Sequence, residues 1–179
     1  MSRFTVKGWH NTGRERPPFA IEPASGQESV WDYPRPPRIE QVADRVRIEF
    51  GGVVLADTVQ ALRVLETASP PTIYIPPQDI RMEFLESARG SSHCEWKGQA
   101  SYWTVRVGDK VALRAGWSYP RPSSDFEAIR DRIAFYAGKM DACFVGEMRV
   151  TPQAGDFYGG WVTPNIVGPF KGDPGTSGW

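Results

Sequence analysis

Two pairs of alternating segments, each joined by a glycine-containing turn, constrain the fold of this chain more than any other feature. Polar and apolar residues alternate strictly across 45–50, and an apolar segment at 53–56 follows a Gly-Gly pair at 51–52. Residues 101–107 and 110–117 likewise divide into two faces at a period of two, on both sides of a Gly-Asp pair at 108–109. A period of two is typical of a half-buried strand, and a two-residue glycine loop is typical of a β-hairpin. The chain is therefore predicted to be mainly β.

Shorter segments complete the predicted sheets. Their residue types predict strands at 62–66, 72–75 and 82–85. A third hairpin is expected between 133–136 and 141–145, with the turn at the Gly-Lys pair between them. These elements predict a compact fold of curled antiparallel sheets.

One short helix is expected between the second and third hairpins. Residues 124–127 read Ser-Asp-Phe-Glu, a capping box in which the serine and the glutamate satisfy free N–H groups at a helix start. Phe126, Ile129 and Ile133 are spaced for one buried face. The pattern predicts a helix of about two turns.

Proline-rich segments at both ends divide the chain into three parts. Prolines remove backbone donors and disfavour helices and central strands, yet the aromatic residues near them are too apolar for disordered tails. We predict one domain, with an extended N-terminal arm at 1–41, a β-rich core at 42–150 and a Gly/Pro-rich tail at 151–179 packed on the core. Both ends are expected to wrap the core through aromatic side chains: Trp9, Phe19, Trp31, Tyr33, Trp161, Phe170 and Trp179.

Charge and composition exclude several classes of protein. The 21 basic and 21 acidic residues cancel, so no overall field attracts nucleic acid, and no nucleic-acid partner is expected. No apolar run reaches the roughly 18 residues of a membrane span, and the first residues lack the apolar region of a signal peptide. The two cysteines form no CxxC pattern, which favours free thiols in a reducing compartment. We expect a cytoplasmic protein without membrane contact, and its oligomeric state stays open.

His93, Cys94 and Lys97 form the most reactive-looking cluster of the chain. A histidine and a nearby ammonium group can lower the pKa of a thiol and make it nucleophilic. Adjacent residues on a strand point to opposite faces, however, and this cluster precedes the predicted strand and can form a loop. Three interpretations stay open: a buried structural cysteine beside a hydrogen-bonded histidine, a catalytic cysteine, or a ligand-binding role for His93 and Lys97.

Glu66 is the most informative acidic residue. It follows Leu62 and Val64 at a period of two, which places a carboxylate on an apolar face. A carboxylate in that position is costly unless it is paired or hydrogen-bonded. Glu66 is therefore expected either to form an ion pair with Lys97 or an arginine, or to line a pocket. Arg63 lies on the other face, where a surface or arm-contacting role is expected.

Several aromatic residues fall near strand ends, where the walls of binding pockets are usually built. An aromatic stripe can be ordinary core, or it can form a cage for a flat or cationic ligand. The residues in question are Tyr74, Trp96, Trp103, Trp117 and Tyr119.

Motifs for metals and common cofactors are absent from the sequence. Two distant histidines and two isolated cysteines make no local zinc motif, and no phosphate-binding glycine motif occurs in the required context. We therefore expect no metal site and no cofactor. Paired carboxylates for two-metal chemistry could arise only if Asp57, Asp79 and Glu66 converge in the fold.

Several long motifs follow one another along the chain: ESVWDYPRPP (28–37), ADTVQALRVLETASPPTIYIPPQDI (56–80), SHCEWKGQASYW (92–103), AGWSYP (115–120) and IAFYAGKMDA (133–142). Together they resemble a bacterial and fungal family, the one catalogued as domain of unknown function 427 and also labelled a nucleotidyltransferase family. Many members read HCPYKG or HCPFKG where this chain reads HCEWKG. The tail GGWVTPNIVGPFKGDPGTSGW resembles the ends of longer members.

The resemblance implies a mostly antiparallel β fold similar to the β-tent folds of methionine sulfoxide reductase B and the Mss4-like group. Relatives in that group carry paired CxxC zinc ligands, which this chain lacks, so no zinc is implied. At the motif positions the resemblance points to polar residues with two aromatic walls: Arg63, Glu66, His93, Cys94, Lys97 and Tyr119, with Tyr74 and Trp117.

Three functions follow as hypotheses, and no catalytic residue is assigned. The leading one is a small-molecule-binding domain with a polar and aromatic pocket, whose role as an enzyme stays open. The second is a divalent-metal-dependent nucleotidyltransferase, as the family label suggests. The third is a protein-interaction module that docks a partner through exposed aromatic residues of the arm.

Overall fold

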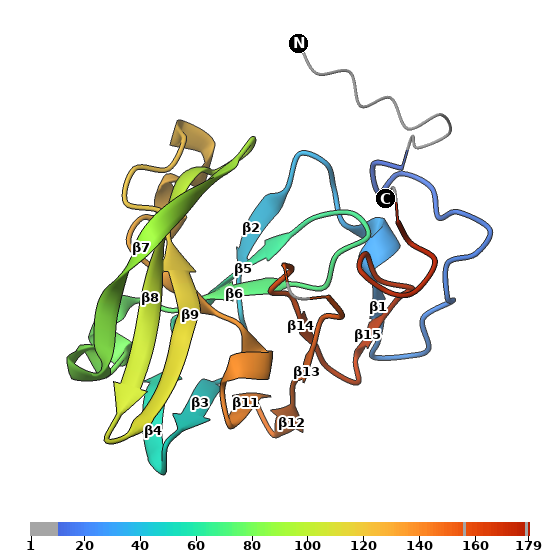
Figure 1. Ribbon diagram of the computed structural model, residues 1–179. Helices are drawn as coiled ribbons and strands as arrows, with labels where there is room; N and C mark the ends of the chain where they lie inside the picture. The colour runs from blue at the N-terminus through green and yellow to red at the C-terminus, as the bar shows by residue number, and fades with distance from the viewer. Residues whose placement is uncertain (1–10, 156, 178) are drawn as a thin grey trace.

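The fold, seen in a computed structural model that describes residues 11–155, 157–177 and 179, is mainly β, with several antiparallel sheets. A long sheet forms one side of the molecule (Figure 1). The sequence expectation of a mainly β protein is therefore confirmed, while the likeness to β-tent folds stays a prediction. The long sheet contains, in spatial order, β10 (Ile133–Phe135), β9 (Lys110–Ser118), β8 (Gly98–Val107) and β7 (Leu85–Cys94).

Two further sheets complete the body. The predicted hairpins at the glycine turns are both confirmed: β3 pairs with β4, and β8 pairs with β9. The second sheet is ordered β12 (Met148–Arg149), β11 (Ala142–Val145), β3 (Val46–Phe50) and β4 (Val53–Thr58). The third is ordered β2 (Arg38–Gln41), β5 (Leu62–Leu65) and β6 (Thr72–Tyr74).

The third predicted hairpin is wrong. β10 pairs with β9 in the long sheet, whereas β11 pairs with β3 in the second sheet. The Gly-Lys pair lies in a 3-10 turn, Ala137–Lys139, that carries the chain from one sheet to the other. Each strand thus finds a partner that is distant in sequence, and no local turn signal reveals such a pairing.

The predicted helix is also only partly right. Ser124–Ile129 is a 3-10 helix that is kinked at Phe126, and its N-cap is Ser123, whose side chain makes no capping hydrogen bond to the helix. Ile133 lies in β10 instead of on the helix. No described residue is in an α-helix. The remaining 3-10 helices are Val30–Asp32, Pro77–Asp79 and Met82–Phe84.

The largest apolar core lies where the long sheet packs on the second sheet. Ile48 from β3 and Val105 from β8 are fully buried in it. Trp161 from the tail joins the same cluster, and its Nε1 donates to the backbone oxygen of Phe135 at 2.9 Å. The tail therefore supplies a side chain to the centre of the molecule.

Arm and tail lie against each other on the side away from the long sheet (Figure 1). Trp31 is fully buried, and its ring meets Trp179 at 5.2 Å and Phe19 at 5.1 Å between centroids. Trp9 lies outside the described residues. The arm and the tail are joined by β1 (Glu28–Ser29) and β15 (Ile166–Val167), which pair in parallel. Inside the tail, β13 (Thr151–Pro152) pairs with β14 (Trp161–Val162) in antiparallel fashion.

Candidate functional site

A cavity of about 350 Å³ opens where the end of β7 and the turn after it meet β6, β9 and the tail. Eight aromatic side chains line it, and charged and polar groups stand among them. Its aromatic lining consists of Tyr74, Trp96, Tyr102, Trp117, Tyr119, Tyr136, Phe157 and Tyr158.

Sheet register brings the inner aromatic rings together. Trp117 on β9 lies directly opposite Tyr102 on β8, so both side chains leave the same face of the long sheet. The Trp117 Nε1 donates to the hydroxyl oxygen of Tyr74 at 3.4 Å, and the two rings meet edge to face. Trp117 also packs on Tyr136, with 4.6 Å between ring centroids. This cluster forms a rigid, largely buried floor.

The tyrosines of this floor are hydrogen-bonding groups as well as apolar surface. Burial raises the pKa of Tyr74 well above its ordinary value of 10.0, and burial raises the pKa of Tyr119 in the same direction. Both hydroxyls stay neutral at physiological pH, so each can donate a hydrogen bond to a ligand oxygen. The Tyr102 hydroxyl is already engaged, at 2.7 Å from Ser92 Oγ.

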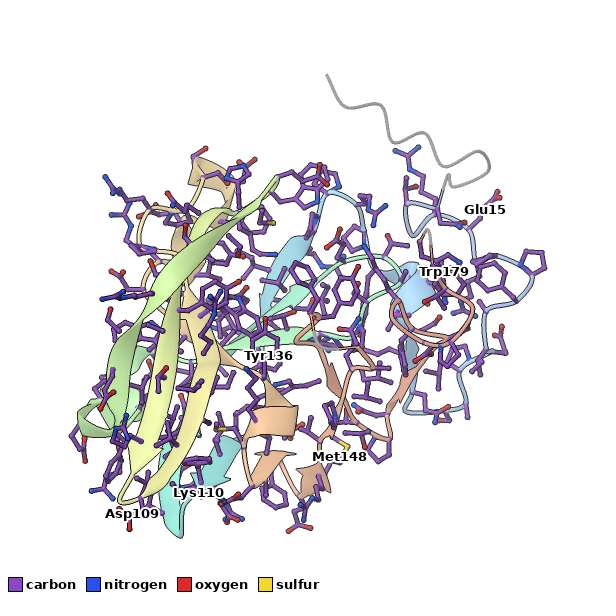
Figure 2. All side chains as sticks on the ribbon, viewed as in Figure 1. Glu15, Asp109, Lys110, Tyr136, Met148 and Trp179 are labelled. Carbon is purple, nitrogen blue, oxygen red and sulfur yellow. The ribbon has the colours of Figure 1, made fainter. Side chains whose placement is uncertain are left out.

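The tail closes one side of the cavity. A Cβ atom at Gly159 would lie 2.2 Å from Cη2 of Trp117, so only glycine lets the tail backbone approach the indole this closely. The hydroxyl of Tyr136 donates to the backbone oxygen of Phe157 at 3.2 Å. Tyr136 lies between the long sheet and the tail (Figure 2). Trp117 and Tyr136 thus hold the tail as a wall of the cavity.

Charged side chains stand among the aromatic rings. Lys97 Nζ lies 5.8 Å from the ring centroid of Tyr119, and Lys171 Nζ lies 5.1 Å from that of Tyr158. Glu66 follows the end of β5 and forms an ion pair with Arg35 from the arm, at 3.3 Å. Both sequence expectations for Glu66 therefore describe it, because it is paired with an arginine and also lines the cavity.

The structure brings seven of the eight candidate residues to this one cavity, together with further lining residues, of which four matter most for its tail side. The tail aromatics and glycines were visible in the sequence as FYGGW, but no periodicity connected them to Trp117. The seven are Glu66, Tyr74, His93, Cys94, Lys97, Trp117 and Tyr119, and the four are Tyr136, Tyr158, Gly159 and Lys171.

Arg63, the eighth candidate, lines a different cavity of about 320 Å³. Its guanidinium lies between the carboxylates of Glu28 and Glu40, which both belong to the arm. The hydroxyl of Tyr33 donates to Glu28 at 2.6 Å. Arg63 is therefore an arm-contacting residue, one of the two roles expected for it, and it does not reach the aromatic cavity.

His93 and Cys94 occupy the last two positions of β7 and not a loop, and they differ in burial. Cys94 is half-buried and packs against the aromatic cluster, whereas His93 is exposed at the rim. Neighbouring side chains of a strand point to opposite faces, which accounts for the difference. This geometry gives no support to a histidine-activated cysteine.

The carboxylates considered for a metal site have separate partners. Asp57 pairs with Arg45 at 2.5 Å, and Asp79 accepts a hydrogen bond from Thr58 at 2.7 Å. Within the part of the chain that the structure describes, no three or more His, Cys, Asp or Glu side chains group in a way that could hold a metal ion. Among the same residues, no helix has the length and apolar character needed to cross a membrane.

The comparison with protein families matches residues 38–146, described as a domain of unknown function, DUF427. The chain belongs to the DUF427 family. The match covers the three sheets of the body except β12 and ends before the tail. The DUF427 region therefore supplies Lys97 and Trp117, while Gly159 and Lys171 lie beyond it. A comparison with curated proteins gives no match.

The two thiols of this DUF427 protein should differ sharply in reactivity. Cys143 is 2% exposed, and burial raises its thiol pKa to about 12, so only about one molecule in 10⁴ carries the thiolate at pH 8. Cys94 is half-buried on the cavity wall. Brief treatment with a maleimide at pH 8 should label Cys94 alone, as measured by intact mass and peptide mapping. Cys94→Ser should abolish the labelling and Cys143→Ser should not; rapid labelling of Cys143 would contradict the prediction.

Proposed function

We propose that this DUF427 protein binds a small molecule with a flat ring in the aromatic cavity. One observation carries the proposal: rings from the long sheet, β6 and the tail surround a single cavity of about 350 Å³. Ligand sites commonly have volumes of about 300–1,000 Å³, with apolar walls and a few polar groups that fix orientation. Tyrosine hydroxyls and lysine ammonium groups supply such polar groups here.

The make-up of the wall supports a ligand site over ordinary core packing. Ordinary core is filled, whereas these rings leave a volume that opens to charged groups. Trp96 and Lys97 belong to the turn between β7 and β8, and Tyr158 belongs to the tail. Segments far apart in sequence thus contribute one wall each, an arrangement that favours recognition of a ligand between them.

Binding of neutral ring compounds tests the proposal. Indole-3-acetamide should bind with a Kd of about 0.1–1 mM, because its roughly 13 heavy atoms at about 0.4 kcal/mol each give about 5 kcal/mol. Trp96→Ala should weaken binding about three- to tenfold through the loss of a ring contact. Isothermal titration calorimetry measures both effects.

Phe19→Ala is the matched control, since it removes an aromatic ring that does not line the cavity. Its affinity for indole-3-acetamide should equal that of the unmodified protein. An absence of binding, or equal losses in Trp96→Ala and Phe19→Ala, would count against the proposed function.

The other two hypotheses receive less support. Metal-dependent nucleotidyl transfer needs carboxylates around a shared ion, but Asp57, Asp79 and Glu66 each interact with a different basic or hydroxyl side chain. A docking role for the arm needs several exposed aromatic residues, yet Trp31 and Tyr33 are buried, and among the described aromatic residues of the arm only Phe19 is exposed. We therefore propose neither.

A further inference from the structure

We infer that the ligand of the aromatic cavity is an anion: a planar ring that carries a carboxylate or phosphate group, which Lys97 and Lys171 bind. This inference rests on the proposed function of the same cavity and adds the chemical class of its ligand. Ligands of both kinds present an oxyanion attached to a ring, and the oxyanion is either a carboxylate or a phosphate.

The partners of the lysine side chains carry the argument. Of the four lysines in the described residues, two interact with oxygen atoms: Lys110 with the carboxylate of Asp141, and Lys139 with the backbone oxygen of Leu113 at 2.8 Å. Lys97 and Lys171 have no such oxygen partner in the described part of the chain, where each only faces a tyrosine ring. These two are also the ones that line the aromatic cavity.

Both lysine residues are half-buried. A lysine in a half-buried position without an oxygen partner gains more from an incoming anion than a fully exposed lysine does. Lys97 lies in the turn after β7, whereas Lys171 lies in the tail. An anion that contacts both would be bound from two separate segments.

The acidic residues of the cavity do not cancel this attraction. Glu66 is already neutralised by Arg35 from the arm. Glu95 is exposed at the rim, and the described residues offer it no ion-pair partner. Two lysines thus face one hydrated carboxylate, which leaves a net positive charge at the cavity. A cationic ligand would meet like charges on two sides.

Neutral hydrogen-bond donors in the wall of the cavity also favour an anionic ligand. The indole Nε1 of Trp96 is buried and has no hydrogen-bond partner among the described residues. A buried donor without a partner is rare in folded proteins and calls for an acceptor. Tyr119 lines the same cavity, and its hydroxyl is a second neutral donor there. The oxygens of a carboxylate or a phosphate accept several such bonds.

Three probes with one ring system test the inference. Indole-3-acetate, indole-3-acetamide and tryptamine share an indole and differ in charge at the side chain. In calorimetry at low salt, indole-3-acetate should bind about tenfold more tightly than indole-3-acetamide, and tryptamine should bind most weakly. AMP against adenosine tests phosphate as the source of the anion. Acetate and inorganic phosphate alone should bind at least tenfold more weakly than the ring-bearing anions.

Lysine variants assign the contacts. Lys97→Gln and Lys171→Gln should each reduce the preference for indole-3-acetate over indole-3-acetamide about threefold, and the double variant should abolish that preference. Lys110→Gln is the matched control, because Lys110 stands at the tip of the β8–β9 hairpin and pairs with Asp141 (Figure 2). Circular dichroism verifies that each variant is folded.

The outcomes separate the two proposals. Equal binding of all three indole probes with sensitivity to Trp96→Ala would overturn the inference and leave the proposed function standing. A preference for anions that persists in the double lysine variant would also overturn the inference. Failure of every ring compound to bind would overturn both proposals. A preference seen only for AMP over adenosine, or only for indole-3-acetate over its amide, supports the inference and identifies phosphate or carboxylate as the source.

Discussion

Trp161→Ala is expected to lower the free energy of unfolding by about 4 kcal/mol, the largest effect of any substitution proposed here. Trp161 is 2% exposed and belongs to the main core, although it lies in the tail beyond the DUF427 match. Alanine leaves a cavity and removes the hydrogen bond to the backbone oxygen of Phe135. In a protein of this size, the melting temperature should fall by about 8–16 °C.

Two controls sharpen this prediction. Phe157→Ala removes another tail aromatic, but one that is 72% exposed, so its effect should stay within about 0.5 kcal/mol. Trp161→Phe keeps most of the apolar volume and should cost less than alanine. Urea denaturation followed by circular dichroism measures all three. If Trp161→Ala proved as mild as Phe157→Ala, the tail would not be part of the folded core.

Arg63→Ala should destabilise the protein by about 2 kcal/mol. The guanidinium joins two carboxylates of the arm to β5, and its loss leaves Glu28 and Glu40 close together without a cation. Removing one partner of a fully buried pair costs about 3–5 kcal/mol, but these side chains are 21% and 35% exposed, so a smaller value is expected. Arg45→Ala breaks the exposed pair with Asp57 and should cost much less than Arg63→Ala, because water and salt screen an exposed ion pair. Comparable losses in both variants would refute the special role of Arg63.

The same cluster makes stability depend on pH in a predictable direction. Burial alone raises the pKa of Glu28, but the hydrogen bonds from Arg63 and Tyr33 outweigh it and hold the pKa below its ordinary value of 4.5. A carboxyl group with a depressed folded-state pKa stabilises the protein above its unfolded-state pKa and loses that contribution as pH falls through the folded-state pKa. The stability gap between wild type and Glu28→Gln should therefore be constant near pH 7 and shrink below about pH 4.5. Denaturation midpoints at pH 7, 4.5 and 3.5 measure this gap.

Local signals in the sequence predicted the fold well where partners are close in the chain. The glycine turns at 51–52 and 108–109 join strands that pair with each other. The turn at 137–139 resembles them in composition, but the strands on its two sides belong to different sheets. Non-local pairing depends on the packing of the whole chain, which the residues near a turn do not encode.

The candidate site could be predicted in part for the same reason. Glu66 stood out because a carboxylate interrupted an apolar face, and Trp117 because it ended a strand. Lys171 and Gly159 carried no such signal, because their role exists only once the tail lies on Trp117. His93 beside Cys94 suggested chemistry by proximity in sequence alone, and the alternation of a strand separates the two side chains.

The parallel pairing of β1 with β15 has a consequence for biosynthesis. Glu28 lies beside Ile166, so the arm emerges from the ribosome long before the strand that fixes it is made. Trp161, which completes the main core, is also translated late. The nascent chain must therefore carry exposed apolar surface from both clusters until the tail is released, since domains fold as units and contacts this distant close slowly. The yield of folded protein in cells should thus depend on the rate of translation and on the supply of chaperones. This dependence should come from the late pairing of the arm with the tail more than from the glycine-turn hairpins, whose strands pair locally.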